Sequence, residues 1–218
     1  DSEVPYNEFD NPVPRSIYGK SKLAGEQMVS SLCTRHIIIR SSWVYGTGAD
    51  FVHEFLEADG RIEVASDECA VPTSAKELAK VIMNLIDGTN YGIFHIVCTG
   101  GPVSRYEYAV KLKKLTGKDI EVKETAGQKH VRPVYSLLDN MMLRICGLEE
   151  PADWKESLQE FLKEMRYSER EKEKNQSHDA DICSIDSGMS VWCTHALRCT
   201  VWLCERHCIC KWYILCNW

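Results

Sequence analysis

The sequence of 218 residues lacks three features that would define its partners. No stretch approaches the roughly 18 consecutive apolar residues of a membrane-spanning helix, so no membrane partner is expected. The chain has no excess of basic residues: 26 Lys and Arg stand against 32 Asp and Glu, and the net charge of −6 argues against nucleic acid as a partner. No basic leader followed by an apolar segment is present, and the first residue is Asp1 rather than Met. We therefore expect a fragment of a longer protein.

A glycine-rich turn of the G-x-x-G-x-x-G kind is also absent from the chain. Such a turn joins a strand to a helix and lets backbone amides approach the pyrophosphate of a dinucleotide. If the protein uses a dinucleotide, the residues that hold its pyrophosphate are therefore not in this sequence.

The eleven cysteines are distributed unevenly: four lie in the first 165 residues and seven in the last 36. Sparse cysteines are typical of a reduced intracellular protein, and we expect a cytoplasmic location. We divide the chain into a domain at 1–166, a charged linker or frayed helix end at 167–181, and a Cys/Trp-rich tail at 182–218. A zinc site and a disulfide module are alternatives for the tail. Its cysteine spacings do not repeat the paired C-x2-C pattern, and seven is an odd number, so we favour a disordered or non-native appended segment and predict no metal site.

The first 165 residues alternate between strand and helix patterns, which predicts an α/β fold. The run at 36–40 (HIIIR) is typical of a strand that is buried on both faces of a parallel sheet, and 61–65, 93–97 and 119–123 are further strand candidates. Ser74-x-x-Glu77 and Ser104-x-x-Glu107 predict capping boxes at the starts of two helices, which should end near Gly88 and Gly117. Another helix is expected from Ala152, and its apolar side chains recur at a helical spacing that predicts a core face: Trp154, Leu158, Phe161, Leu162 and Met165.

The helix after Pro14 combines a predicted core stripe with a pair of polar side chains. Its apolar stripe is formed by Ile17, Ala24, Met28 and Leu32, whereas Tyr18 and Lys22 lie four residues apart on a neighbouring face. A cation beside a phenol favours the phenolate form, so the tyrosine can give up a proton near neutral pH while a carbonyl is reduced to an alcohol. On its own, Y-x-x-x-K is a weak signal, because any long helix can contain it by chance, and a solvated lysine beside a half-buried tyrosine is the more frequent arrangement.

The segments around this pair carry a more specific resemblance. In chain order they are 18–26 (YGKSKLAGE), 39–46 (IRSSWVYG), 50–52 (DFV), 67–73 (DECAVPT), 92–95 (GIFH), 132–133 (RP) and 153–155 (DWK). This ordered set, from about Val4 to Met165, resembles the extended short-chain dehydrogenase/reductase family, and within it the dTDP-4-dehydrorhamnose reductase branch. The resemblance implies the C-terminal part of a Rossmann-like, doubly wound NAD(P)-binding fold with a small α/β substrate-binding lobe. The N-terminal glycine-rich half would be absent.

The resemblance also assigns roles to individual residues. Tyr18 would protonate the C4 oxygen of dTDP-4-dehydro-L-rhamnose while NADPH or NADH supplies the hydride, and Lys22 would hold the nicotinamide ribose and assist the tyrosine. Both residues, together with Ser42, are thus expected to contact the cofactor. The expected substrate contacts are Trp43, Tyr45 and Arg132. For Arg132, which would bind the diphosphate, a surface ion pair is an equally open alternative.

Two function classes remain open on the sequence. The first is a nucleotide-sugar reductase of polysaccharide biosynthesis, with a divalent cation in the parent enzyme and a homodimer as further expectations. In that case the fragment alone would have little activity. The alternative is a non-catalytic subunit, because the regulatory beta subunit of methionine adenosyltransferase resembles the same branch and works by binding a partner.

Overall fold

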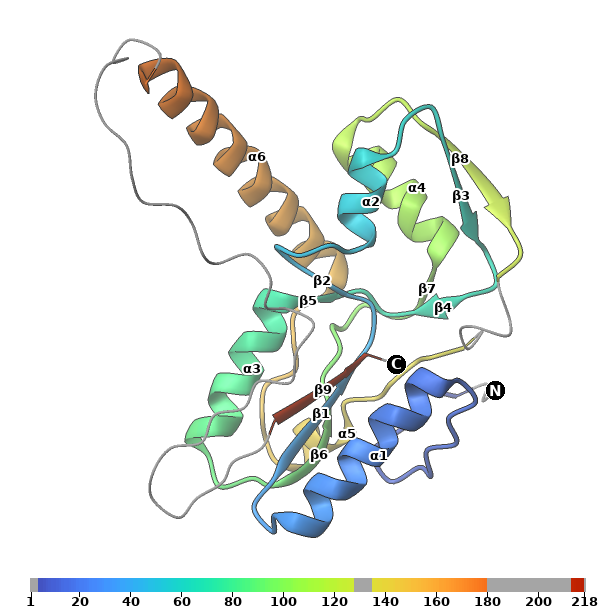
Figure 1. Cartoon of the computed structure of the whole chain (residues 1–218), viewed down its shortest axis with the longest axis vertical. Coiled ribbons are helices and arrows are strands. Elements are labelled where there is room, and N and C mark those ends of the chain that lie inside the picture. The colour runs from blue at the N-terminus through green and yellow to red at the C-terminus, as the bar shows by residue number, and fades with distance from the viewer. Residues whose placement is uncertain (1–3, 128–134, 180–212, 218) are drawn as a thin grey trace.

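A computed structural model describes residues 4–127, 135–179 and 213–217, which form two lobes (Figure 1). The first lobe is built on a sheet with strand order β6-β1-β9, where β1 is Ile37–Ser41, β6 is Gly92–His95 and β9 is Tyr213–Asn217. Both β6 and β9 run parallel to β1. The mixed α/β class and the parallel strand at 36–40 are confirmed.

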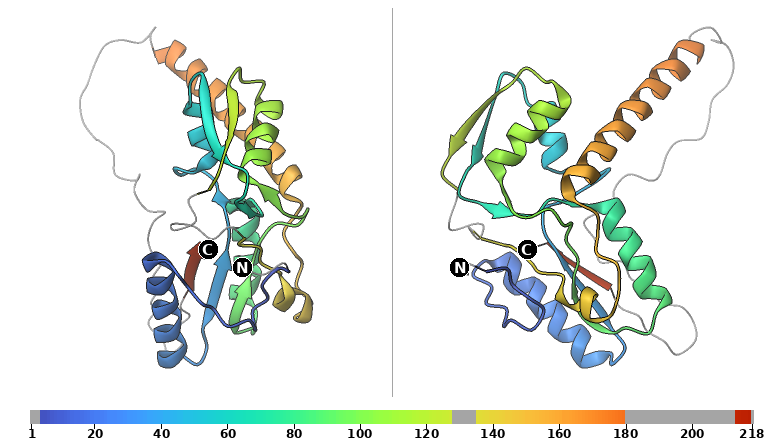
Figure 2. Two further views of the ribbon diagram at one scale, coloured as in Figure 1. Left: turned by 90° about the vertical axis from the view of Figure 1, so that its right-hand side faces the viewer. Right: turned by 180° about the vertical axis from the view of Figure 1, so that it is seen from behind.

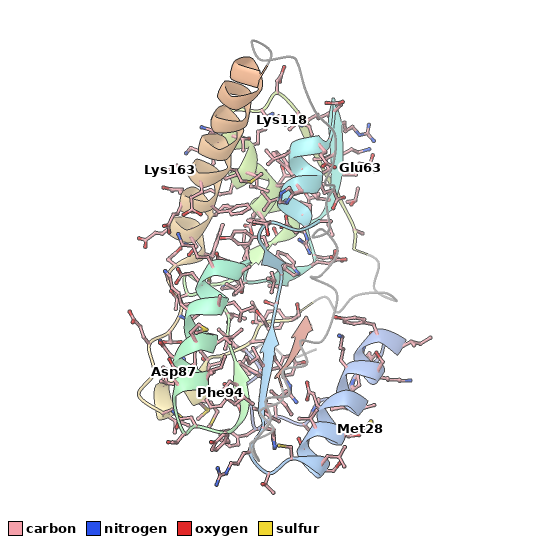
Figure 3. All side chains as sticks on the ribbon, turned by 60° about the vertical axis from the view of Figure 1, so that its left-hand side comes forward. Met28, Glu63, Asp87, Phe94, Lys118 and Lys163 are labelled. Atoms are coloured by element: carbon pink, nitrogen blue, oxygen red, sulfur yellow. The ribbon has the colours of Figure 1, made fainter. Side chains whose placement is uncertain are left out.

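Helices cover both faces of β1. Side chains of a strand alternate between faces, so Ile37 and Ile39 share one face and Ile38 and Arg40 share the other. The first face packs on α3 (Ala75–Asp87) in a core that includes Phe94 of β6, which Figure 3 shows beside this helix. Across the other face lies α1 (Ile17–Leu32), whose Glu26 reaches Arg40. A short helix, α5 (Met141–Ile145), packs on β6 and buries Leu143.

The second lobe holds the larger core. Its strand β3 (Arg61–Ala65) pairs in parallel with β8 (Glu121–Thr125), and β4 (Cys69–Ala70) pairs antiparallel to β7 (Val103–Ser104). Helices α2 (Phe51–Glu57) and α4 (Arg105–Thr116) pack together, and both contribute to the core. A two-residue parallel pair joins the lobes, β2 (Val44–Tyr45) with β5 (Thr73–Ser74). Strand 119–123 was predicted two residues too early, because β8 begins at Glu121.

The last helix, α6 (Trp154–Asp179), buries Trp154, Leu158 and Leu162 in the second lobe's core, as the apolar spacing from Ala152 predicted. It starts between the lobes and extends away from the sheet (Figure 2). The helix continues through 179, so most of the segment expected as a linker or frayed end is helical. Except for β9, the Cys/Trp-rich tail lies outside the described residues, and the domain boundaries stay a prediction.

The two predicted capping boxes have different outcomes. At α4, the Glu107 amide donates to Ser104 Oγ at 3.1 Å while Glu107 Oε2 accepts from the Ser104 amide at 2.9 Å. Gly117 ends this helix with φ of 70°, a left-handed conformation that glycine adopts without strain. Helix α3 also begins after its predicted cap, but the Ser74 side chain makes no capping bond. Glu77 instead accepts from the Ala152 amide and pairs with Lys80, so that box is wrong.

The predicted core stripe of α1 is also wrong. Ile17, Met28 and Leu32 are 87%, 62% and 80% exposed, and Ala24 is exposed as well; Met28 is labelled on α1 in Figure 3. The face turned inward carries Gly19 and Glu26, with Leu23 partly buried. The helix is therefore seated by a charged side chain rather than by its apolar stripe.

Candidate active site

Tyr18 and Lys22 lie together at the start of α1. Ser16 caps the helix, since its Oγ accepts from the Gly19 amide at 3.0 Å. Tyr18 is thereby held in the first turn and is 53% exposed. Lys22, one turn later, places its ammonium 5.4 Å from the centroid of the Tyr18 ring. Among the described residues, Lys22 has no carboxylate in an ion pair with it. The structure thus forms the phenol and ammonium pair that the spacing predicts, with the tyrosine exposed and the lysine partly buried.

The start of α1 and the end of β1 point toward the same end of the sheet, facing the second lobe (Figure 1). This is the carboxyl edge of the parallel strands, where open α/β sheets bind their ligands. The loop that leaves β1 here carries Ser42 and Trp43. The fold therefore brings the predicted catalytic pair and this predicted binding loop to one edge, and Tyr45 lies on the next strand.

Trp43 has a strained backbone and a fixed ring. Its φ of 41° lies in the left-handed region, which is unfavourable for a bulky residue. The Arg105 guanidinium lies 3.7 Å from the centroid of the Trp43 ring and 4.6 Å from that of Phe51. Tyr108 stacks on both rings, with centroid distances of 6.4 Å to Trp43 and 5.6 Å to Phe51. The Arg105 guanidinium therefore covers one face of the indole. Trp43 is only half-buried, and a ligand could contact the part of the ring that stays accessible.

Ser42 and Tyr45 are placed as packing residues. The Ser42 side chain is fully buried, and its hydroxyl donates to the Val71 carbonyl at 3.0 Å. Tyr45 is 3% exposed and meets Phe161 edge to face at 5.4 Å, and burial raises the pKa of its phenol well above the usual range. This placement favours indirect roles for both over direct contact with cofactor or substrate. Arg132 lies outside the described residues.

A buried ion pair connects α1 to β1. Arg40 Nε donates to Glu26 Oε1 at 3.0 Å and Arg40 Nη2 donates to Glu26 Oε2 at 2.7 Å, and both side chains are nearly inaccessible to solvent. Sequence reasoning missed this pair. One signal was available, because an arginine in a strand expected to be buried on both faces needs a buried partner.

A second polar cluster lies beside this pair. Glu8 Oε1 accepts from the backbone amides of His95 and Met142, at 2.9 and 3.1 Å. Burial raises the pKa of the Glu8 carboxyl. Burial, with a smaller contribution from Arg40, lowers the pKa of His95 to about 4, so the imidazole is neutral at pH 7. Its Nδ1 lies 3.1 Å from the Tyr6 carbonyl and donates to it. These contacts tie the N-terminal segment to the sheet.

The described residues contain no group of three or more His, Cys, Asp or Glu side chains able to hold a metal ion. None of the helices in this part of the chain is both long and apolar enough to cross a bilayer. Cys69, Cys98 and Cys146 are free thiols.

Comparisons with known proteins agree with this geometry. The family model described as "RmlD substrate binding domain" matches residues 1–167. The spore coat polysaccharide biosynthesis protein SpsK of Bacillus subtilis is 36% identical over 168 residues, covering 73% of this chain and 58% of that protein. The dTDP-4-dehydrorhamnose reductase of Mycolicibacterium smegmatis is 33% identical over 173 residues, covering 74% of this chain and 53% of that protein.

Solved structures give the same result. The dTDP-4-dehydrorhamnose reductase of Clostridium acetobutylicum superposes with a TM-score of 0.73 at 36% identity, over 76% of this chain and 61% of that one. The enzyme of Bacillus anthracis, solved in complex with NADP, superposes with a TM-score of 0.70 at 35% identity, over 73% of this chain and 59% of that one. The chain thus spans little more than half the length of these relatives. With a family match over 1–167 and relatives above 30% identity, the chain belongs to the RmlD substrate binding domain family.

Proposed function

We propose that this chain supplies the proton donor and part of the substrate site for NAD(P)H-dependent reduction of a nucleotide-sugar ketone, with dTDP-4-dehydro-L-rhamnose as the substrate. The observation that carries the proposal is the Tyr18–Lys22 pair, half-exposed at the carboxyl edge of the sheet. Relatives at 31–36% identity are named as reductases of this sugar, which supports the substrate class. Residues 1–166 form the proposed family domain.

In this proposal the phenol of Tyr18 donates its proton to the C4 oxygen as the ketone becomes an alcohol. The ammonium of Lys22 stabilises the phenolate that is left, because it lies over the same ring. Its partly exposed position and its lack of a carboxylate in an ion pair among the described residues also fit a hydrogen bond to a ribose hydroxyl. When bound, NAD(P)H would supply the hydride. The residues present fit only its nicotinamide-ribose end, because the sequence holds no glycine-rich pyrophosphate cradle.

Trp43 is the proposed contact for the sugar ring. An indole held from one side by Arg105 loses little conformational freedom when a ligand binds its open part. Ser42 and Tyr45 would support it from within the fold, and Arg132 stays the predicted contact for the diphosphate. A cytoplasmic location, a homodimer and a divalent cation in the parent enzyme also stay predictions.

The test compares turnover by the protein with Tyr18 and with Tyr18→Phe. The 218-residue chain, and the protein expressed with any coding sequence that adjoins its first codon, are incubated with dTDP-4-dehydro-L-rhamnose, and the oxidation of NADPH is followed. Removing a general acid should lower kcat at least about a hundredfold. We expect the effect in the longer form, with little activity in the short one.

The matched control is Tyr91→Phe, because Tyr91 precedes β6 at the opposite edge of the sheet. It should leave turnover unchanged. Absence of turnover in the folded longer protein would overturn the proposal and favour the non-catalytic subunit, which a pull-down with methionine adenosyltransferase would then test. Equal turnover by wild type and Tyr18→Phe would keep the reductase but remove this tyrosine from its mechanism.

A further inference from the structure

We propose that Arg40 is a positioning residue for Lys22: by holding the carboxylate of Glu26, it prevents Glu26 from capturing the Lys22 ammonium and so leaves that ammonium to Tyr18. The inference deepens the proposed function and rests on it for its catalytic meaning. The contacts themselves can be tested without turnover.

The argument begins with spacing along α1. Tyr18, Lys22 and Glu26 follow one another at intervals of four residues, so their side chains lie in one row on the helix surface. Side chains four residues apart are neighbours, and a lysine and a glutamate at this spacing can form an ion pair. Lys22 could therefore turn forward to Glu26 or back to Tyr18. In the structure it lies over the Tyr18 ring.

Arg40 is the competitor that decides between these positions. Its Nε donates to Glu26 Oε1, with a longer contact of 3.3 Å to Oε2, and its Nη2 donates to Oε2. Both carboxylate oxygens are thus engaged in the planar fork that only a guanidinium offers. The Glu26 side chain is 3% exposed, so the pair is shielded from competing water. A carboxylate held in this way is not available to Lys22.

Arg40 is itself held firmly. It lies in β1 between Ile39 and Ser41, both of which are buried, and opposite His95 of β6 in the parallel register. Hydrogen bonding along β1 therefore fixes the position of the Arg40 guanidinium along the strand, and with it the point on α1 that the guanidinium reaches. The pair has two consequences for the helix: it seats α1 against the sheet, and it gives Glu26 a partner other than Lys22.

The test measures the position of Lys22 by NMR on the 218-residue chain with isotopically labelled lysine. Protons that lie over a tyrosine ring are shifted by its ring current. The Lys22 ε-proton signal is identified as the one that disappears in Lys22→Arg. The part of its chemical shift that comes from the Tyr18 ring is identified as the part that disappears in Tyr18→Leu. In Arg40→Met the freed Glu26 carboxylate should draw Lys22 away, so the shift should fall by at least half. Adding Glu26→Gln removes the competing charge, and the shift should return.

If the ion pair served only to attach α1 to the sheet, the result would differ. The double variant Arg40→Met with Glu26→Gln also lacks the ion pair, so it should lose the ring-current shift as Arg40→Met does. That result, or an unchanged shift in Arg40→Met, would overturn the proposal. The control is Arg144→Met, which breaks an exposed two-carboxylate contact with Asp139 and Glu150 far from Lys22 and should leave the signal unchanged. If Arg40→Met does not fold, the uncharged Arg40→Gln replaces it, and a shift equal to that of wild type would then overturn the proposal.

Turnover gives a second and separate measurement. In the longer protein, Arg40→Met should lower kcat about tenfold, which is less than the roughly hundredfold loss expected when the general acid itself is removed. The KM for the sugar should stay within about threefold of wild type, because the substrate contacts stay in place. If Tyr18→Phe does not affect turnover, the proposed function fails while the NMR result still decides where Lys22 lies.

Discussion

Helices α1 and α4 both lie against parallel strands, but different forces hold them. Helix α4 buries Tyr108, Ala109 and Leu112 in the second lobe's core. Helix α1, although longer, fully buries only Gly19 and Glu26, and its Ile17, Met28 and Leu32 face outward. Many small contacts hold α4, whereas a single ion pair carries much of the attachment of α1.

The difference affects how each helix responds to change. Apolar burial contributes about 25 cal/mol per Å², spread over every contact, so no single substitution removes it all. A buried ion pair is stable only while both partners are present. Helix α1, which carries the proposed reacting pair, is therefore the element that one substitution can unseat. Helix α4, which supports the lobe, should be displaced only by several.

The largest expected effect comes from breaking the buried pair. Arg40→Met removes the guanidinium that neutralises the buried Glu26 carboxylate, which should lower the free energy of unfolding by about 3 to 5 kcal/mol, and by less to the extent that Lys22 replaces it as the partner of Glu26. The double variant Glu26→Met with Arg40→Met replaces the pair by apolar side chains and should recover most of that loss. Urea denaturation of the three proteins measures both values. A free energy of unfolding of Arg40→Met equal to that of wild type would show that the pair is not the main attachment of α1.

A second test compares the same residue type in the two helices. Leu112 of α4 is fully buried, so Leu112→Ala should cost about 2 to 5 kcal/mol through lost burial and the cavity left behind. Leu32 of α1 is 80% exposed, and Leu32→Ala should change stability by less than about 0.5 kcal/mol. Denaturant midpoints give both differences. A large loss in Leu32→Ala would mean that the exposed face of α1 is covered in solution.

The two helices also show how far the sequence predicts this fold. The capping box at Ser104 and the left-handed glycine at Gly117 fixed the ends of α4, because both devices act within a few residues. The stripe of Ile17, Met28 and Leu32 predicted the wrong inner face for α1. Apolar spacing assumes that a charged residue faces solvent, and Glu26 breaks that assumption by pairing with Arg40. The partner lies on another element, so local spacing could not reveal it.

In the candidate site, too, contacts within one helix could be predicted from the sequence, whereas contacts between elements could not. Tyr18 and Lys22 are one helical turn apart, and their contact followed directly from spacing. The cation over Trp43 did not, because Arg105 belongs to α4 and reaches the indole only through the packing of the lobe. Tyr45 was expected near the substrate from its place beside Trp43 in the chain, but the pair β2–β5 directs it into the core.

His95 offers a test of the sheet beside the α1 attachment. Folding lowers the pKa of His95 from 6.5 to about 4, so the unfolded chain binds more protons between these values. Stability from this residue is full above pH 6.5 and is lost as the pH falls toward 4, by about 2 kcal/mol between pH 7 and pH 5. Glu8, whose folded pKa is raised, acts in the opposite direction, and Arg40 and Asp139 are the other charges nearby. His95→Gln should flatten the profile measured by urea denaturation, and an unchanged slope would assign it to other groups.

The smallest effects concern the two helix caps, where α1 and α4 become most alike. Ser104→Ala removes the acceptor of a reciprocal capping box and should cost about 1 kcal/mol. Ser16→Ala removes one bond at the start of α1 and should cost about 0.5 kcal/mol. Their effects on turnover should have the reverse order, because the Ser16 cap closes the turn that holds Tyr18, whereas α4 contributes packing. Urea denaturation ranks the two variants by loss of stability, and NADPH oxidation on the same preparations ranks them by loss of turnover. If Ser104→Ala impaired turnover more than Ser16→Ala, the aromatic stack under Trp43 would be limiting, and the second lobe rather than α1 would set the rate.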